Sequence, residues 1–587
     1  MQDSVSTLPV AGRHGHRRGT RIGRGTMVTA MLAVVTVAAS ACQTADAANK
    51  ANLPKPGGTL NVILSVPIAH LDPQQISTAT DYNIARLFTR TLTTYRAAPG
   101  AAGSQIVPDL ATDTGRPSQN NTVWDFTLKD GVKWQDGSPI TCDQVKYGVE
   151  RSYSSLLQDG LKYTKQYLVD NAGGYQGPYA SGPTDDLKSV VCVSTKTIQF
   201  HLKQPVGDFG YAVSTPTFAP VPPSIEGKDR LGYDNQPFSD GPYKIQPGAT
   251  HEKMTLVRNN FWDPATDPIR HQYPDRIDIS VNDNTPEVTN NLIQSQGQYQ
   301  YSINIDADVA PNFVQQVLND PALSARVVTG PAAIIRYFAI NTRRITDVNC
   351  RKALVYAFNK RRYLRAMGGS AFGDIATTMI PPGLAAHQDF DLYNSLANPE
   401  GNPDQAQQLV AGEKGKCPTS IRVAFPDNPA IRARVATLVD AYQAAGIGVV
   451  LVPLAPGTYF STGIGNPHNT YDLMYAGWVP DFPNGSAVIP PLFDGRQIPT
   501  SGDSGNLNFS LLDDPDINAL IDQAFAESDL TKQYRLWGQL DQKIAELAPT
   551  IPVIYQKPLR MEGTKVRGAY ISPAFAEPDL VSLGVAP

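Results

Sequence analysis

Residues 121–153, NTVWDFTLKDGVKWQDGSPITCDQVKYGVERSY, decide the fold of this chain. The aromatic and β-branched residues at 123–128 predict a strand, and glycine-containing turns bracket a second short strand at 132–134. Thr141, with Gln144 three residues later, predicts a capping box that opens a helix. Every position has a structural reason, as a turn, cap or core residue, so the stretch predicts a fold and not a chemistry.

The same stretch resembles a signature of the family 5 solute-binding proteins, which are the peptide, dipeptide, nickel and oligosaccharide receptors of ABC importers. The residues that carry the resemblance are Leu128, Gly131, Val132, Trp134, Asp136, Gly137, Pro139, Ile140, Thr141 and Val145. Gln144 stands where the family usually has Asp. Further segments match the family in the family's own order, at 57–60, 71–73, 107–111, 197–205, 241–243, 256–262 and 339–354. The resemblance therefore covers nearly all of the chain beyond residue 53.

The second half of the chain predicts an α/β protein without help from the resemblance. Strands are predicted at 420–425 and 448–452, and between them lies a helix with one apolar stripe and Gly446 as its stop. The stripe consists of Ile431, Val435, Leu438, Tyr442 and Ala445. A strand, a crossover helix and a strand form a βαβ unit, so we expect the two strands to pair in parallel.

The resemblance implies a two-lobed α/β fold of the periplasmic-binding-protein type, with an extra subdomain and a ligand cleft between the lobes. A chain of 587 residues is too long for one hydrophobic core, which agrees with more than one lobe. We expect lobe 1 to comprise 55–335 and 556–587 and to carry the extra subdomain. We expect lobe 2 to comprise 336–555.

The first part of the chain, 1–41, has the plan of a signal peptide. Arginines come first, and an uncharged apolar run at 27–39 follows, which is too short and too rich in alanine for a membrane span. Small residues before Cys42 then resemble the lipobox of bacterial lipoproteins, although Ala39 stands where Leu is usual. The resemblance implies that Cys42 is lipidated, that 42–54 is a linker, and that the protein is held at the outer face of the cell membrane.

Two alternatives concern this N-terminal segment. Cleavage could occur nearby and leave Cys42 free. Arg17-Arg18 raises a twin-arginine export signal, which we disfavour because Gly19 and Thr20 follow where apolar residues would be expected.

Four further cysteines are Cys142, Cys192, Cys350 and Cys417. An even number in an exported protein suggests disulfides, and three pairings are possible. We favour Cys142–Cys192 and Cys350–Cys417 because each pair would stay within one expected lobe. A zinc site is the weaker alternative, since the sequence has no CxxC segment and no neighbouring histidine.

Residues 471–484, YDLMYAGWVPDFPN, are the candidate binding stretch. A strand rich in aromatic residues breaks at Gly477 and leads to Trp478 and to one carboxylate, Asp481. A large aromatic surface beside one acid suits a cationic head group, whereas the alternative is a buried tryptophan and a turn-capping aspartate. In peptide-binding members of the family, a Gly-Trp-x-x-Asp segment supplies an aspartate that pairs with the α-ammonium group of the peptide. The resemblance therefore implies this role for Asp481.

Tyr475 stands where some oligopeptide receptors carry a basic residue that helps to hold the carboxylate of the ligand. That anchor must then come from elsewhere, or the ligand is a longer peptide, a modified peptide or a sugar. Such a ligand would stack on Tyr475, Trp478 and Phe482. The family also lines its cleft just after a Leu-Asp-Pro turn, where an ordinary loop is the alternative. The residues at this place are Ser77, Thr78 and Ala79.

The sequence favours a binding protein over an enzyme. It has no GxSxG, HExxH or Walker A segment, and its histidines are not at metal-ligand spacing, so we expect no catalytic residue, no metal and no cofactor. A net charge of −4 predicts no bulk attraction to nucleic acid. The resemblance implies a monomer that captures a peptide and delivers it to an ABC permease. The alternatives are a receptor for an oligosaccharide or a metal chelate, and a non-transport lipoprotein that has kept the fold.

Overall fold

The structure is a computed structural model that describes residues 53–157, 159–170, 174–180, 186–226, 230–413, 415–502 and 504–586. The expected signal peptide, Cys42 and all but the end of the expected linker lie outside the described residues. The chain divides into two units, 1–53 and 54–587, and the second unit holds every element described below. Among the described residues, no helix is long and apolar enough to cross a membrane.

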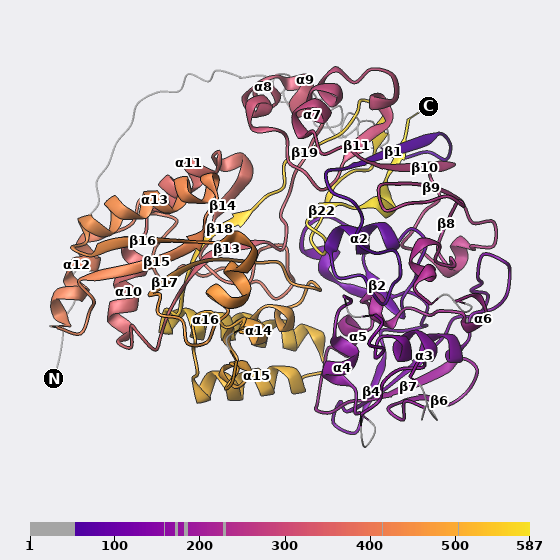
Figure 1. Cartoon of the computed structure of the whole chain (residues 1–587), viewed down its shortest axis with the longest axis horizontal. Helices are drawn as coiled ribbons and strands as arrows, with labels where there is room; N and C mark the ends of the chain where they lie inside the picture. Colours follow the sequence, from indigo (N-terminus) through magenta and orange to yellow (C-terminus); the bar gives the residue numbers. More distant parts are fainter. Residues whose placement is uncertain are drawn as a thin grey trace, which may run out of the picture. The chain divides into compact units, whose positions relative to one another are not determined.

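A five-stranded sheet with the order β11-β1-β10-β9-β8 organises one part of this unit (Figure 1). Its strands are β1 (Thr59–Leu64), β8 (Tyr243–Ile245), β9 (Lys253–Arg258), β10 (Arg276–Val281) and β11 (Ser302–Asn304). β1 pairs in parallel with β10 and β11, whereas β9 pairs antiparallel with β8 and β10. The sheet shares one hydrophobic core with helix α2 (Ala79–Ala85) and with the C-terminal segment of the chain. Residues near both ends of the second unit therefore meet in one core.

A four-stranded antiparallel sheet with the order β4-β5-β7-β6 contains the stretch that decides the fold. Its strands are β4 (Arg116–Ser118), β5 (Val123–Thr127), β6 (Val190–Cys192) and β7 (Thr197–His201). The predicted capping box is confirmed, because Thr141 and Gln144 open helix α3 (Cys142–Arg151). The predicted strand at 132–134 is wrong: Lys133 makes one isolated bridge to Pro139, because the turns on both sides leave too few residues for a ladder. A disulfide joins Cys142 at the start of α3 to Cys192 in β6.

A six-stranded sheet with the order β14-β18-β13-β17-β15-β16 organises another part. Its strands are β13 (Ile335–Ile340), β14 (Gly373–Ile375), β15 (Ser420–Pro426), β16 (Gly448–Leu454), β17 (Leu473–Trp478) and β18 (Thr550–Gln556). The predicted βαβ unit is confirmed, since β15 and β16 pair in parallel and helix α13 (Pro429–Ala444) connects them. The second disulfide joins Cys350 and Cys417, which is also the pairing that the sequence favours.

The two faces of this sheet pack into two different hydrophobic cores. One face packs against α10 (Val348–Ala357), α11 (Lys360–Met367) and α13. The other packs against α14 (Ile489–Phe493), α15 (Pro515–Ala526) and α16 (Leu530–Leu547), and that core continues into the four-stranded sheet and α3. Helices α14 to α16 therefore lie between the six-stranded and the four-stranded sheet.

Smaller two-stranded sheets complete the unit. They pair β2 (Thr93–Tyr95) with β3 (Ile106–Pro108), β12 (Val327–Val328) with β19 (Arg560–Met561), β20 (Val566–Arg567) with β23 (Gly584–Val585), and β21 (Ile571–Ser572) with β22 (Glu577–Pro578).

Candidate ligand-binding site

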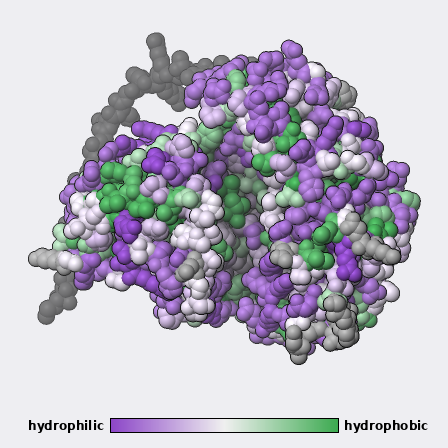
Figure 2. Space-filling model, in the orientation of Figure 1, coloured by the Kyte–Doolittle hydropathy of each residue, from purple (hydrophilic) through white to green (hydrophobic). Residues whose placement is uncertain are grey.

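Two neighbouring cavities share Ser77 and Asp481 in their walls. The larger has a volume of about 860 Å³ and the smaller about 250 Å³. In both, one wall comes from the loop before α2 and from 159–167, and the opposite wall comes from the chain that follows β17. The space-filling view shows a hollow with hydrophobic residues at its floor, between the part with the six-stranded sheet and the part with the five-stranded sheet (Figure 2). We take these two cavities as the candidate site.

Asp481 lies at the junction of the two cavities. Its Oδ2 accepts a hydrogen bond of 2.7 Å from the hydroxyl of Tyr163, which comes from helix α4 (Tyr163–Tyr167) on the opposite wall. Removal of solvent by the cavity walls raises the pKa of the Asp481 carboxyl, and the hydrogen bond from Tyr163 opposes this rise. Among the described residues, no cation forms an ion pair with Asp481. This carboxylate can therefore accept a positively charged group from a ligand.

An aromatic cluster fixes the position of Tyr163. Its ring stacks on Tyr167 with the centroids 5.7 Å apart and lies 5.3 Å from the ring of Phe482. Phe482 in turn stacks on Tyr211 at 5.7 Å. Because these rings are held by packing, the Tyr163 hydroxyl approaches Asp481 from a set direction. The sequence around Tyr163 predicts no binding role for it. Its one local feature is an aromatic partner four residues later, Tyr167, and such pairs are also common in hydrophobic cores.

The loop before α2 contributes three of the expected residues to the site. Ser77 lines both cavities, and Thr78 and Ala79 line the smaller one. Thr78 is also the N-cap of α2, since its hydroxyl accepts a hydrogen bond of 3.1 Å from the backbone N–H of Asp81. The side chain of Thr78 therefore stabilises the start of α2, besides any contact with a ligand.

Trp478 is the last residue of β17 and lines the larger cavity. Its indole N–H donates to the carbonyl oxygen of Ala487 at 2.7 Å, which fixes the plane of the ring. Gly477 is not among the lining residues. A Cβ atom there would lie 2.5 Å from Nη1 of Arg336 on the neighbouring strand β13, so glycine leaves room for that side chain.

The rings of Tyr475 and Phe482 are not brought to either cavity. Tyr475 is 4% exposed, and its ring packs edge-on against Phe338 in the core beneath α10 and α13. Phe482 is 2% exposed and belongs to the core of the five-stranded sheet. The expectation that these two rings stack on a ligand is therefore not met in this conformation, because both are enclosed by other side chains.

The larger cavity contains further charged residues that the sequence analysis did not single out. Arg496 donates to both carboxylates that flank it, Asp494 at 2.9 Å and Asp522 at 2.7 Å. Asp159 and Lys162 lie on the wall that carries Tyr163. Among the described residues, no group of three or more histidine, cysteine or acidic side chains could hold a metal ion. The larger cavity presents both charged and aromatic side chains.

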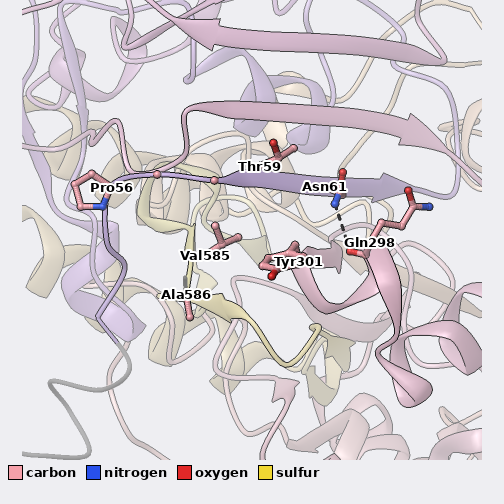
Figure 3. A pocket seen from close by; sticks show the side chains of 9 residues that line it. Pro56, Thr59, Asn61, Gln298, Tyr301, Val585 and Ala586 are labelled. Carbon is pink, nitrogen blue, oxygen red and sulfur yellow. Dashed lines mark hydrogen bonds between the residues drawn. The ribbon is translucent and has the colours of Figure 1, made fainter.

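A third cavity of about 560 Å³ lies at the start of β1, next to η5 (Gly297–Tyr301) and β23. Figure 3 shows Asn61 donating to the carbonyl oxygen of Gln298 at 3.4 Å in its wall. None of its described lining residues is charged, and none belongs to the expected site. We therefore do not assign the ligand to this cavity.

Comparisons with known proteins agree with this geometry. A family model described as bacterial extracellular solute-binding proteins, family 5 Middle, matches residues 105–500. The periplasmic murein peptide-binding protein MppA of Escherichia coli is 24% identical over 77% of this chain and 80% of its own length. The oligopeptide-binding protein OppA of Bacillus subtilis is 21% identical over the same shares of the two chains.

A solved structure with the same fold is that of clavulanic acid biosynthesis oligopeptide binding protein 2. It superimposes with a TM-score of 0.82 at 30% sequence identity, and the match covers 91% of this chain and 96% of that one. The described chain thus has the two-lobed α/β fold of periplasmic binding proteins, as the sequence predicts.

Proposed function

The chain belongs to the bacterial extracellular solute-binding proteins of family 5, and from this premise we propose that it captures a peptide beside Asp481 and delivers it to an ABC-type permease. The single observation that carries the proposal is a carboxylate in a cavity wall with a hydroxyl donor but no cationic partner among the described residues. The volume of the larger cavity falls in the range of ordinary ligand sites. The printed names of the relatives above describe peptide-binding proteins.

In this proposal the α-ammonium group of the peptide donates to Oδ1 of Asp481 while Tyr163 keeps its hydrogen bond to Oδ2. A charge-assisted hydrogen bond is stronger than a neutral one. The indole face of Trp478 and the loop at Ser77 enclose the rest of the ligand. Hinge closure then presents the loaded form to the permease, so no bond of the ligand is made or broken.

We also propose that lipidation of Cys42 holds the protein at the outer face of the cell membrane. The support is the signal-peptide plan of 1–41 and the small residues before Cys42. In cells that express the full chain, the protein is expected in the membrane fraction, and a Cys42→Ser variant is expected in the medium or periplasm. A Cys42→Ser protein that stays with the membrane would contradict the anchor but not the binding function.

Calorimetric titration with trialanine and with N-acetyl-trialanine tests the binding function. Trialanine should bind the wild-type protein more tightly than N-acetyl-trialanine does. Asp481→Asn should lose about 1.5 to 3 kcal/mol of the trialanine binding free energy, the usual contribution of a hydrogen bond to a charged group. N-acetyl-trialanine should bind the wild type and Asp481→Asn equally weakly.

Asp522→Asn is the matched control, because it removes one negative charge from the same cavity but next to Arg496. This variant should keep the preference for the free amino group. If trialanine and its acetylated form bind the wild-type protein with the same affinity, Asp481 is not an ammonium anchor. If neither binds while a sugar or a metal chelate raises the melting temperature, the ligand class is wrong.

A further inference from the structure

His70 lies between two carboxylates, one at each ring nitrogen. Its Nδ1 is 2.9 Å from Oδ2 of Asp234, and its Nε2 is 3.2 Å from Oδ2 of Asp159. Asp234 is firmly held, because its Oδ1 accepts the backbone N–H groups of Leu71 and Asp72 at 2.7 Å each. The side chain of Asp159 is 68% exposed, and it contacts the His70 ring from the solvent side.

Asp159 begins the segment 159–163, which lines the larger cavity and ends in Tyr163. The segment lies directly on the loop that follows His70: a Cβ atom on Gly160 would be 1.9 Å from the carbonyl oxygen of Gln74. Further along, the hydroxyl of Thr217 donates to the carbonyl oxygen of Leu161 at 3.2 Å. The contact with His70 therefore holds Asp159 at one end of the segment 159–163, and Tyr163 at the other end donates to Asp481.

The protonation state of His70 decides whether both contacts can exist at once. A neutral imidazole has one N–H donor, whereas the imidazolium has two. Since both ring nitrogens face carboxylate oxygens, only the imidazolium donates to both. When the ring loses a proton, the lone pair of one ring nitrogen faces a carboxylate and repels it. Backbone N–H groups hold Asp234 in place, whereas Asp159 is exposed, so Asp159 is the partner that moves away.

We propose that His70 is a positioning residue of the ligand site, and that its imidazolium fastens the segment 159–163 in the shape that binds the ligand. The effect on the ligand rests on the function proposed above, whereas the effect on the segment does not. Affinity should be greatest while His70 is protonated and should fall as the pH rises through the His70 titration.

Four charged or titratable groups surround this ring. Asp159 and Asp234 hydrogen-bond to the His70 ring. Asp81 accepts a hydrogen bond of 3.4 Å from the backbone N–H of His70. The Nε2 atom of His251 lies 3.7 Å from Oδ2 of Asp234. Partial burial of the ring opposes protonation, but the hydrogen bonds and charges of Asp234 and Asp159 outweigh it and raise the pKa of His70. His251 is kept intact in the test because it lies beside the same Asp234 carboxylate as His70.

The test measures hydrogen exchange of the backbone amides in 159–163, without ligand, at two pH values below and above the His70 titration. Protection factors correct for the intrinsic pH dependence of exchange. In the wild type these amides should be several-fold better protected at the lower pH. In His70→Gln and in Asp159→Asn the protection should not change with pH. His468→Gln, on the exposed loop before β17, is the matched control and should behave as the wild type.

Two companion measurements complete the test. The NMR titration of the His70 ring should show a pKa above that of an exposed histidine, and Asp159→Asn should lower it. As the pH rises through the His70 titration, the affinity for trialanine should fall by up to about tenfold for each unit by which ligand binding raises the pKa of His70. Only variants that retain both His70 and Asp159 should show this fall.

Equal protection factors at both pH values, or a ring that titrates below an exposed histidine, would overturn the proposal. If the exchange behaves as expected but trialanine binds at no pH, the fastening holds and the function proposed above fails.

Discussion

At the scale of single residues, one carboxylate and one hydroxyl mark the candidate site. The hydroxyl of Tyr163 donates a hydrogen bond to Asp481, and the rings of Tyr167 and Phe482 pack against the ring of Tyr163. The sequence identified Asp481 through its place after Gly477 and Trp478. It gave no means to pair Tyr163 with it, because that contact depends on how two segments far apart in the chain are folded together.

The alternation of β17 explains why Trp478 and Tyr475 differ. Successive side chains of a strand point to opposite faces, so Trp478 shares a face with Met474 and Ala476, whereas Tyr475 shares the other face with Leu473. The first face packs in the core with α14 to α16 and the second in the core with α10 and α13. Both faces of β17 carry apolar side chains, so the sequence alone does not show which face places its last side chain in the cavity wall.

The affinity for a peptide should depend on the ionisation of Asp481. Desolvation raises the pKa of Asp481 above the ordinary value of an aspartate, so its carboxyl is protonated more readily than that of a free aspartate. An ammonium group needs the carboxylate, so affinity is fully present above this pKa and falls as the pH drops through it, by about tenfold per pH unit. Titration calorimetry in buffers of different ionisation enthalpy should detect proton release on binding in that window.

The titration proposed for His70 has the opposite slope, because affinity would fall as the pH rises through it. The two slopes together should make the complete pH profile pass through a maximum. Asp481→Asn should abolish the acidic limb alone. An acidic limb that persists in Asp481→Asn would assign that titration to another group.

At the scale of elements, the sequence predicted the parts that are specified by local rules. The capping box of α3 and the parallel pair β15 and β16 with its crossover helix are both present. Caps and apolar stripes depend on neighbours within a few residues, so they can be seen in the sequence. The strand expected at 132–134 is not formed, because a strand also needs a partner in the right register, and only Pro139 faces Lys133.

Removal of the N-cap of α3 should destabilise the four-stranded part of the protein. In Thr141→Ala the side chain no longer accepts from the N3 backbone N–H, which should lower the free energy of unfolding by about 1 kcal/mol. Ser138→Ala is the control, since its hydroxyl contacts only the exposed Asp136. Urea unfolding followed by fluorescence measures both. Equal effects of the two substitutions would show that the cap contributes nothing specific.

At the scale of the whole molecule, the hydrophobic cores do not follow the expected lobe boundaries residue by residue. Phe482 lies within 336–555 in the sequence but packs in the core of the five-stranded sheet. Close by, the buried Asp208 accepts hydrogen bonds from Asn484, at 2.7 Å, and from Ser486. The segment after β17 therefore packs against parts of the chain that belong to the expected lobe 1. Such ties depend on tertiary packing, which a single sequence does not show.

Native mass spectrometry of the protein purified from its own cells identifies the ligand that the protein binds in the cell. We expect a bound ligand that is released on unfolding and fragments as a peptide with a free amino terminus, and we expect Asp481→Asn purified in the same way to carry much less of it. A bound ligand that fragments as a sugar would show that the ligand is not a peptide, and a peptide population retained equally by Asp481→Asn would show that Asp481 does not hold it.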